Sequence, residues 1–161
     1  MKIAMACDHG AYELKERLKL RLTEQGHEIV DCGTNSAESC DYPDYGRPAA
    51  QMVAWGECDR AILMCTTGIG ISMVANKVKG VRCALCHDPW SAEMTRRHND
   101  ANALAMGANV VGPGLAERIV DVFLSTELRA AAISAGWTRS WRRRRWGNAS
   151  TAAVIGIWRC A

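Results

Sequence analysis

The chain has 161 residues, 48% of them hydrophobic, which suffices for one α/β domain with a core and is too short for two full domains. Its net charge of +3 is unevenly spread, because the segment from Arg129 onward holds seven arginines and no Asp, Glu or Lys. The remainder carries 13 Lys and Arg against 17 Asp and Glu, a net charge of −4. The basic character therefore belongs to the tail and gives no reason to expect a nucleic-acid-binding fold.

The amino-terminal residues and the cysteines indicate the cellular compartment in which the protein works. The apolar run that starts at Met1 is broken at once by Asp8 and His9, which neither a signal peptide nor a membrane span would tolerate. The eight cysteines are scattered and lie mostly in apolar runs, the usage expected of small buried hydrophobes in a reducing environment. We therefore expect a cytoplasmic protein without a membrane span and without a disulfide framework.

The hydrophobic pattern predicts five strands that alternate with five helices. The expected strands cover residues 2–7, 28–32, 60–65, 81–86 and 103–111. The expected helices run from Ala11 to Gly26, from Pro48 to Gly56 after a loop over 41–45, from the turn at 66–70 to Lys77, from Pro89 to His98, and onward from Pro113. This alternation predicts a five-stranded parallel sheet covered by helices on both faces, with ligands bound outside the carboxyl ends of the strands.

Three segments near strand ends carry reactive side chains. They are Cys7-Asp8-His9-Gly10 after the first strand, residues 65–70 after the third, and His98-Asn99-Asp100 just before the fifth. Each alone has a structural explanation, since a buried cysteine is usually core, a His-Asn pair is usually a helix end, and a Gly-x-Gly turn is common. Their joint placement favours a functional site.

The middle segment has a physical case for acid–base chemistry. A thiol at Cys65 would face a helix N-terminus, where the positive potential favours the thiolate, so Cys65 could act as a base. Backbone N–H groups from Thr67 to Ser72 would converge on the same space and hold an anion such as an enediolate oxygen. No lysine follows the glycines, so the segment is not a Walker-type nucleotide loop.

Five short motifs occur in the order seen in type B ribose-5-phosphate isomerases, and the chain resembles that family over residues 1–128. The motifs are Asp8-His9-Gly10, Asp41-Tyr42-Pro43, Cys65-x-Thr67-Gly68-Ile69-Gly70, Ala75-Asn76-Lys77 and His98-Asn99-Asp100-Ala101-Asn102. The resemblance implies a Rossmann-like three-layer α/β sandwich that forms a homodimer or homotetramer. It also implies a cofactor-free and metal-free interconversion of an aldose phosphate and a ketose phosphate through a cis-enediolate.

The resemblance also implies roles for individual residues. Cys65 would move the proton between C1 and C2, His98 would assist ring opening, and Thr67 would complete the catalytic set. The implied substrate contacts are Asp8, His9, Tyr42, Thr66, Gly68, Ile69, Gly70, Ser72, Asn99 and Asn109. His98 and Asn99 would reach the site from a partner subunit. These residue types suit the chemistry, because abstracting a proton next to a carbonyl needs a base, an acid and stabilisation of an oxyanion.

The chain departs from the family pattern at several positions. Thr66 stands where the family usually has glycine, which narrows the room for substrate. Asn109 stands where many members have an arginine for the phosphate, and Ala132 and Gly136 stand where two more phosphate-binding arginines are expected. The segment 129–161, rich in Arg and Trp, is open to two interpretations: a shifted reading frame or a disordered tail.

Two further patterns in the sequence each have a simpler explanation. Cys83-Ala-Leu-Cys86-His87 fits the pattern of c-type haem attachment, but it lies in a predicted buried strand, which favours core cysteines. The run Arg142–Arg145, flanked by tryptophans, could bind RNA or an anionic membrane. Three functions thus remain open: an active isomerase of ribose, allose, galactose or tetrose phosphates, a catalytically impaired sugar-phosphate-binding protein, and an α/β domain with a nucleic-acid-binding tail, the last being disfavoured.

Overall fold

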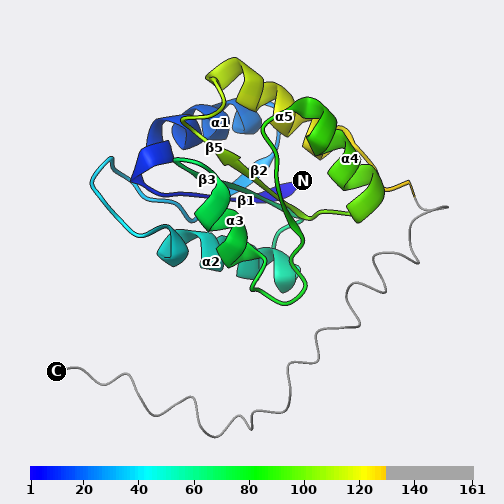
Figure 1. Ribbon diagram of the computed structural model, residues 1–161, viewed down its shortest axis with the longest axis horizontal. Coiled ribbons are helices and arrows are strands. Elements are labelled where there is room, and N and C mark those ends of the chain that lie inside the picture. The colour runs from blue at the N-terminus through cyan, green and yellow to red at the C-terminus, as the bar shows by residue number, and fades with distance from the viewer. Residues whose placement is uncertain (130–161) are drawn as a thin grey trace, which may run out of the picture. The chain divides into compact units, whose positions relative to one another are not determined.

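A parallel sheet of five strands lies at the centre of the computed structural model, which describes residues 1–129 (Figure 1). The strands are β1 (Lys2–Cys7), β2 (Glu28–Asp31), β3 (Arg60–Cys65), β4 (Cys83–Leu85) and β5 (Ala103–Gly107), in the order β2-β1-β3-β5-β4. All four pairings between neighbouring strands are parallel. The predictions for the tail, including those for Ala132 and Gly136, lie outside the described residues.

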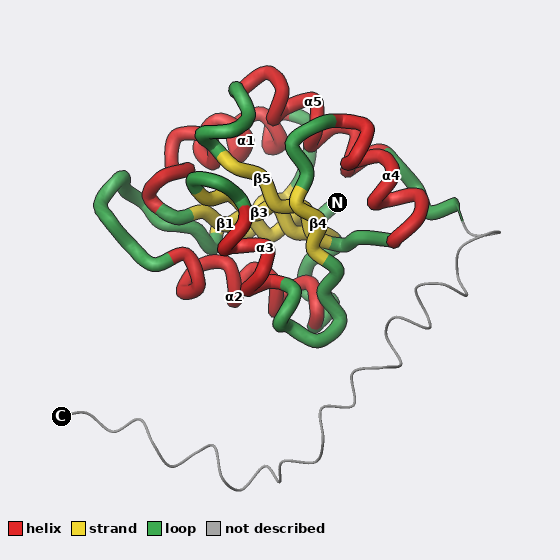
Figure 2. Tube along the Cα trace, in the orientation of Figure 1, coloured by secondary structure: helices red, strands yellow, loops and turns green. Residues whose placement is uncertain are grey.

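Helices cover both faces of this sheet (Figures 1 and 2). They are the short 3-10 helix η1 (His9–Ala11), α1 (Tyr12–Glu24), α2 (Tyr42–Ala54), α3 (Ile69–Ala75), α4 (Pro89–Asn99) and α5 (Pro113–Ser125). Helices α1, α4 and α5 pack on one face, and α2 and α3 pack on the other. The predicted three-layer α/β sandwich with a five-stranded parallel sheet is therefore confirmed.

Successive side chains along each strand point to opposite faces of the sheet, and this alternation divides the core in two. Ile3 and Met5 of β1 pack toward α1 and α5, whereas Ala4 and Ala6 pack toward α2. Because both faces of the sheet are buried, the strands read in the sequence as nearly unbroken apolar runs. That property is the reason the strand positions could be predicted.

Helix α2 differs from the sequence-based prediction, because it begins at Tyr42 and includes Pro48. The predicted loop over 41–45 and the predicted helix start at Pro48 are wrong. The first turn packs closely on α3, since a Cβ on Gly46 would lie 2.6 Å from Cγ1 of Ile71. Pro43 in the first turn is compatible with a helix start, and these tertiary contacts stabilise a turn that local sequence does not favour.

Parallel pairing brings the carboxyl ends of β1, β3 and β5 to one edge of the sheet. Residues 8–11, the turn at 66–68 and the segment 108–112 follow these ends and therefore lie near one another. This edge carries most of the predicted site. Within the described range of residues, no helix combines the length and the apolar character needed to cross a membrane.

Candidate active site

Cys65 ends β3 and is 5% exposed. The chain turns back immediately after it, so that the backbone N–H of Gly68 donates a hydrogen bond to Sγ of Cys65 at 3.0 Å. Gly68 has a φ of 77°, and a Cβ there would lie 2.6 Å from the carbonyl carbon of Met106. Only glycine fits this turn, and the turn aims an amide proton at the sulfur, where it stabilises negative charge.

Three other cysteines, Cys7, Cys83 and Cys86, also lie at or next to strand ends. Burial raises the pKa of Cys7, at the end of β1, to about 12, so this residue stays a neutral thiol at physiological pH. Burial likewise raises the pKa of Cys83 to about 12 and that of Cys86 to about 11. Cys83 and Cys86 lie on or beside the short strand β4, which agrees with the interpretation of core cysteines.

Thr66 occupies space that Gly10 leaves free. A Cβ on Gly10 would overlap with Oγ1 of Thr66, so the threonine packs against the glycine of η1. The loop after β1 and the loop after β3 are therefore fitted to each other. Thr66 therefore narrows the room for substrate less than the sequence suggests, because part of its side chain occupies the space left by the missing side chain of Gly10.

The loop from Thr67 into α3 presents polar groups of two kinds. Thr67 is exposed, and the N–H of Ile69 donates to its Oγ1 at 3.4 Å. Ser72 is 8% exposed, and its hydroxyl donates to the carbonyl of Ile69 at 2.7 Å while its N–H donates to that of Gly68 at 3.2 Å. The N–H of Ser72 is therefore not open to an anion, contrary to the expectation for the whole segment 67–72.

Tyr42 joins this loop from the first turn of α2. A Cβ on Gly70 would lie 2.7 Å from Cζ of Tyr42, which places the phenol ring directly against the glycine. Tyr42 remains 36% exposed beside the loop. The sequence-predicted contacts Tyr42, Ile69 and Gly70 are thus neighbours in the structure.

Asp8 and His9 follow β1 on the same edge. Asp8 is 6% exposed, and its Oδ1 accepts the N–H of Gly10 at 3.0 Å. Burial raises the pKa of Asp8, and the hydrogen bond from Gly10 offsets part of this effect. Nδ1 of His9 lies 3.1 Å from the backbone nitrogen of Cys40 and 3.2 Å from its carbonyl oxygen, so the backbone of Cys40 holds this side of the ring whether Nδ1 accepts or donates a proton.

A cleft of about 370 Å³ opens beside His9. Asn109 also lines it, and its backbone N–H donates to the carbonyl of Thr66 at 3.1 Å. Arg17 and Glu13 of α1 also line the cleft, and Nε of Arg17 donates to Glu117 at 2.7 Å. The predicted contacts His9 and Asn109 therefore share one cavity.

His98 and Asn99 lie elsewhere. Helix α4 starts after β4 at the carboxyl edge of the sheet and returns to the amino edge, where β5 begins. His98 and Asn99, at its end, are exposed. A single chain therefore does not bring them to Cys65.

A rigid network holds this end of α4. Asp100 has a φ of 46°, and its carboxylate pairs with Arg82 at 2.7 Å and with Arg96 at 3.0 Å. Arg96 is 3% exposed and also donates to the carbonyl of Ala101. The exposed His98 and Asn99 are thus displayed by a well-anchored helix end.

His87 is a residue whose contact the sequence reasoning missed. The N–H of Gly107 donates to its Nε2 at 3.1 Å, which adds a side-chain bond where the pairing of β4 and β5 ends. Gly107 pairs with Cys65 in the sheet, and a Cβ on it would lie 2.6 Å from the carbonyl carbon of Thr67. His87 follows a strand directly, which is the signal that could have identified it.

No metal site emerges from the described residues, since residues 1–129 hold no group of three or more His, Cys, Asp or Glu side chains placed to bind an ion. The absence of a cofactor and of a metal remains an expectation from the sequence.

Comparison with known proteins identifies the family of this chain. Residues 3–135 match the family described as ribose/galactose isomerase. The chain is 52% identical over 128 residues to the putative sugar phosphate isomerase YwlF of Bacillus subtilis, which covers 79% of this chain and 86% of that protein. It is 48% identical over 126 residues to ribose-5-phosphate isomerase B of Escherichia coli, which covers 78% of this chain and 85% of that protein.

A solved structure leads to the same family. That of ribose-5-phosphate isomerase B from Clostridium thermocellum superposes with a TM-score of 0.86 at 46% identity, over 88% of this chain and 96% of that one. The resemblance noted in the sequence is confirmed, and this chain belongs to the ribose/galactose isomerase family, a family of sugar-phosphate isomerases.

Proposed function

We propose that this protein interconverts ribose 5-phosphate and ribulose 5-phosphate, with Cys65 as the catalytic base. The observation that carries the proposal is the hydrogen bond from Gly68 N–H to Cys65 Sγ at 3.0 Å, at the carboxyl edge of the sheet. Cys7 ends the neighbouring strand, but burial raises its pKa to about 12, which makes it a poor base at neutral pH.

The proposed reaction moves one proton between adjacent carbons. The Cys65 thiolate removes the proton from C2 of the open-chain aldose, and the electrons of the C–H bond form an enediolate with negative charge on O1. The proton then returns from the Cys65 thiol to C1 while the O2 proton moves to O1, which leaves a hydroxyl on C1, the ketose carbonyl at C2 and a restored thiolate. Thr67, two residues after Cys65 and exposed, is the proposed partner for the enediolate oxygens.

We place the phosphate in the cleft beside His9 and Asn109. His9 and Asn109 both line this cavity, and the imidazole and the side-chain amide can each donate a hydrogen bond to a phosphate oxygen. Neither is a permanent cation, so we expect weaker phosphosugar binding than an arginine at residue 109 would provide. Each hydrogen bond to a charged group contributes about 1.5 to 3 kcal/mol.

We further propose that a second copy of the chain completes the site with His98 and Asn99. Both are exposed at the edge of the sheet opposite Cys65, so they can serve only a neighbouring molecule's site. Beside the loop 65–68 the surface is apolar, with Ile69 47%, Met73 61% and Leu85 38% exposed. An apolar surface of this kind suits contact with another copy.

The reducing cytoplasm is the compartment that we propose. The seven cysteines within residues 1–129 are all free thiols, as the chemistry assigned to Cys65 requires.

An assay with purified protein tests the proposed function. Ribose 5-phosphate in D2O should yield ribulose 5-phosphate, and NMR should detect deuterium at the carbon that receives the proton. Cys65→Ala should lower turnover by at least about a hundredfold, the scale of general acid–base catalysis. Cys58→Ala is the matched control, because Cys58 is 4% exposed and lies in the turn before β3, at the amino edge.

Several results would contradict the proposal. A Cys65→Ala variant that retains a tenth of wild-type turnover would show that another group is the base. Binding of ribose 5-phosphate without turnover would identify a catalytically impaired binding protein instead. Faster turnover of allose, galactose or tetrose phosphates would reassign the substrate while keeping the mechanism.

A further inference from the structure

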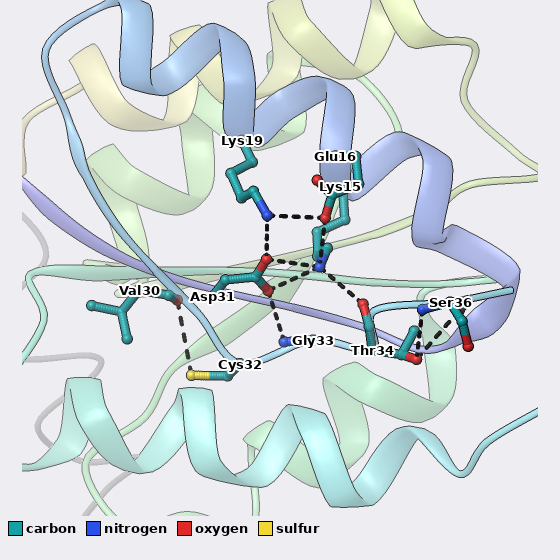
Figure 3. A network of polar contacts seen from close by, with 9 residues as sticks. All are labelled: Lys15, Glu16, Lys19, Val30, Asp31, Cys32, Gly33, Thr34 and Ser36. Atoms are coloured by element: carbon teal, nitrogen blue, oxygen red, sulfur yellow. Dashed lines mark hydrogen bonds and ion pairs between the residues drawn. The ribbon is translucent and has the colours of Figure 1, made fainter. Parts of the chain in front are cut away.

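Lys15 of α1 is a buried cation outside the reacting groups described above. Its side chain is 0% exposed, yet its ammonium lies among polar partners (Figure 3). Nζ donates to both carboxylate oxygens of Asp31, at 3.0 and 2.8 Å, and to the carbonyl of Thr34 at 2.9 Å. It also pairs with Glu16 at 2.8 Å.

These contacts fasten the chain where it leaves β2. Asp31 ends β2, and its Oδ1 also accepts the N–H of Gly33 at 3.0 Å. Gly33 passes so close to the lysine stem that a Cβ would lie 2.8 Å from Cδ of Lys15. The N–H of Thr34 donates to the carbonyl of Cys7 at 3.2 Å, so Lys15 holds Thr34 against the end of β1.

The segment that starts here ends at the proposed active site. From Gly33 it runs along the carboxyl edge of the sheet to Cys40, just before α2. The N–H of Cys40 donates to Nδ1 of His9 at 3.1 Å. One end of residues 33–40 is therefore bound to a buried ammonium, and the other end is bound to the imidazole of His9.

The charges in this cluster balance at neutral pH. Burial would raise the pKa of Asp31, but the bonds from Lys15 and Lys19 outweigh it and lower the pKa. Burial would lower the pKa of Lys15, but its bonds to Asp31 and Glu16 outweigh it and raise the pKa. Lys19 joins from the surface, donating to Asp31 at 2.7 Å and to Glu16 at 3.0 Å.

We propose that Lys15 is a positioning residue for His9: by holding Thr34, it fixes residues 33–40 so that the backbone of Cys40 meets Nδ1 of the imidazole. The proposal rests on the proposed function in one respect, that His9 contacts the phosphosugar. The consequence for catalysis is a His9 ring with one orientation, in which Nδ1 contacts Cys40 and Nε2 is left for the substrate.

Stability alone is a weak reason for a buried lysine. Replacing a buried ion pair by apolar side chains is often neutral or stabilising, so such pairs are better explained by the geometry that they impose. The geometry here is specific, because Lys15 binds the backbone of residues 33–40 while Lys19, on the same carboxylates, does not.

The experiment compares Lys15→Met with Lys19→Met in the full-length protein. Both variants remove a lysine that binds Asp31 and Glu16, and only the first releases the carbonyl of Thr34. The nitrogen chemical shifts of His9 report its tautomer and its bond from Cys40, and the His9→Asn variant assigns them among the four histidines. We expect Lys15→Met to shift both nitrogens and Lys19→Met to leave them at their wild-type values.

Kinetics provides the second measurement. Lys15→Met should raise KM for ribose 5-phosphate by about tenfold or more, the equivalent of losing one hydrogen bond to a charged group, with kcat changed much less. In a His9→Asn background the same substitution should leave KM unchanged, because the two residues act through one contact. A lysine that only stabilises the fold would raise KM in neither background once the protein is folded.

The proposal is overturned if folded Lys15→Met keeps the wild-type nitrogen shifts of His9. It is also overturned if Lys19→Met changes these shifts as much as Lys15→Met does. If Lys15→Met does not fold, combining it with Asp31→Asn removes the carboxylate charge that has lost Lys15 and keeps the acceptor for Gly33 N–H. The same shifts are then measured in that double variant. If the wild-type protein lacks isomerase activity, the proposed function fails, and the His9 shifts still decide whether Lys15 positions the ring.

Discussion

Asp8 illustrates, at the scale of a single residue, a side chain whose burial opposes stability. Burial raises the pKa of Asp8 above the pKa that this residue has in the unfolded chain. The protonated side chain therefore contributes to stability at pH values below the unfolded-state pKa. That contribution is lost as the pH rises through the pKa of Asp8 in the folded protein. At neutral pH the ionised carboxylate therefore destabilises the fold, as is common for groups kept for chemistry.

We predict that Asp8→Asn raises Tm at pH 7, because the amide keeps an oxygen for the N–H of Gly10 and has no charge to bury. Near pH 3 the gain should shrink, since Asp8 is then protonated. The same variant should lose at least about tenfold in kcat/KM, if Asp8 contacts the sugar. Thermal unfolding at the two pH values, with kinetics at pH 7, checks this, and a lower Tm at pH 7 would contradict it.

Gly10 and Thr66 form a complementary pair. We predict that Gly10→Ala destabilises the protein by about 1 to 3 kcal/mol, the usual cost of overpacking, because the new methyl group meets the threonine side chain. Adding Thr66→Gly should recover most of the loss, since it removes the group that clashes. Urea unfolding of the two single variants and the double variant measures the coupling, and additive losses would show that the residues are independent.

At the scale of whole elements, the ends of the strands are held by contacts from outside the ladder. Beyond the last backbone pair of β4 and β5, the N–H of Gly107 donates a hydrogen bond to the side chain of His87. Gly107 in turn supports Thr67, whose backbone lies within contact distance of its Cα. The short strand β4 therefore helps to place the loop that follows β3.

We predict that His87→Ala increases the exchange rate of the Gly107 amide by about tenfold, the equivalent of one hydrogen bond. His87→Gln should restore much of the protection, because its side-chain oxygen can accept the same N–H. Amide exchange followed by NMR distinguishes the two variants. Equal protection of Gly107 in wild type and His87→Ala would mean that the histidine does not hold this strand end.

At the scale of the whole molecule, the proposed site is divided between two copies. Cys65 lies at the carboxyl edge of the sheet, and His98 lies at the amino edge. The surface beside Cys65 exposes Ile69, Met73 and Leu85, and this apolar surface is where we propose that the second copy binds. The predictions for Ala132 and Gly136 concern residues beyond the described part of the chain and stay predictions.

Mixing two inactive variants tests this division. Cys65→Ala and His98→Asn proteins, each with little activity alone, should regain about one quarter of wild-type activity after unfolding and joint refolding. Random pairing of a two-fold dimer makes half the dimers mixed, and each mixed dimer has one intact site. Activity that stays at the level of the separate variants would show that Cys65 and His98 do not act together across an interface.

Local sequence determined most of the sheet. The strand predictions over 2–7 and 60–65 match β1 and β3, because strands buried on both faces need unbroken apolar runs. The rule that ligands bind beyond the carboxyl ends of parallel strands then led to Asp8, His9 and Cys65. The expected strand over 103–111 ends at Gly107, where the chain leaves the ladder to reach the site.

Only the tertiary structure decided which distant side chains meet. The start of α2 at Tyr42 depends on packing against Gly70, and the ring of His9 depends on Cys40, which is 31 residues away. The role proposed for Lys15 depends on a carbonyl at Thr34 that has no signature in the sequence. Apolar periodicity reports which face of an element is buried, whereas a contact between two loops depends on the positions of both, and those are set only when the whole sheet has assembled.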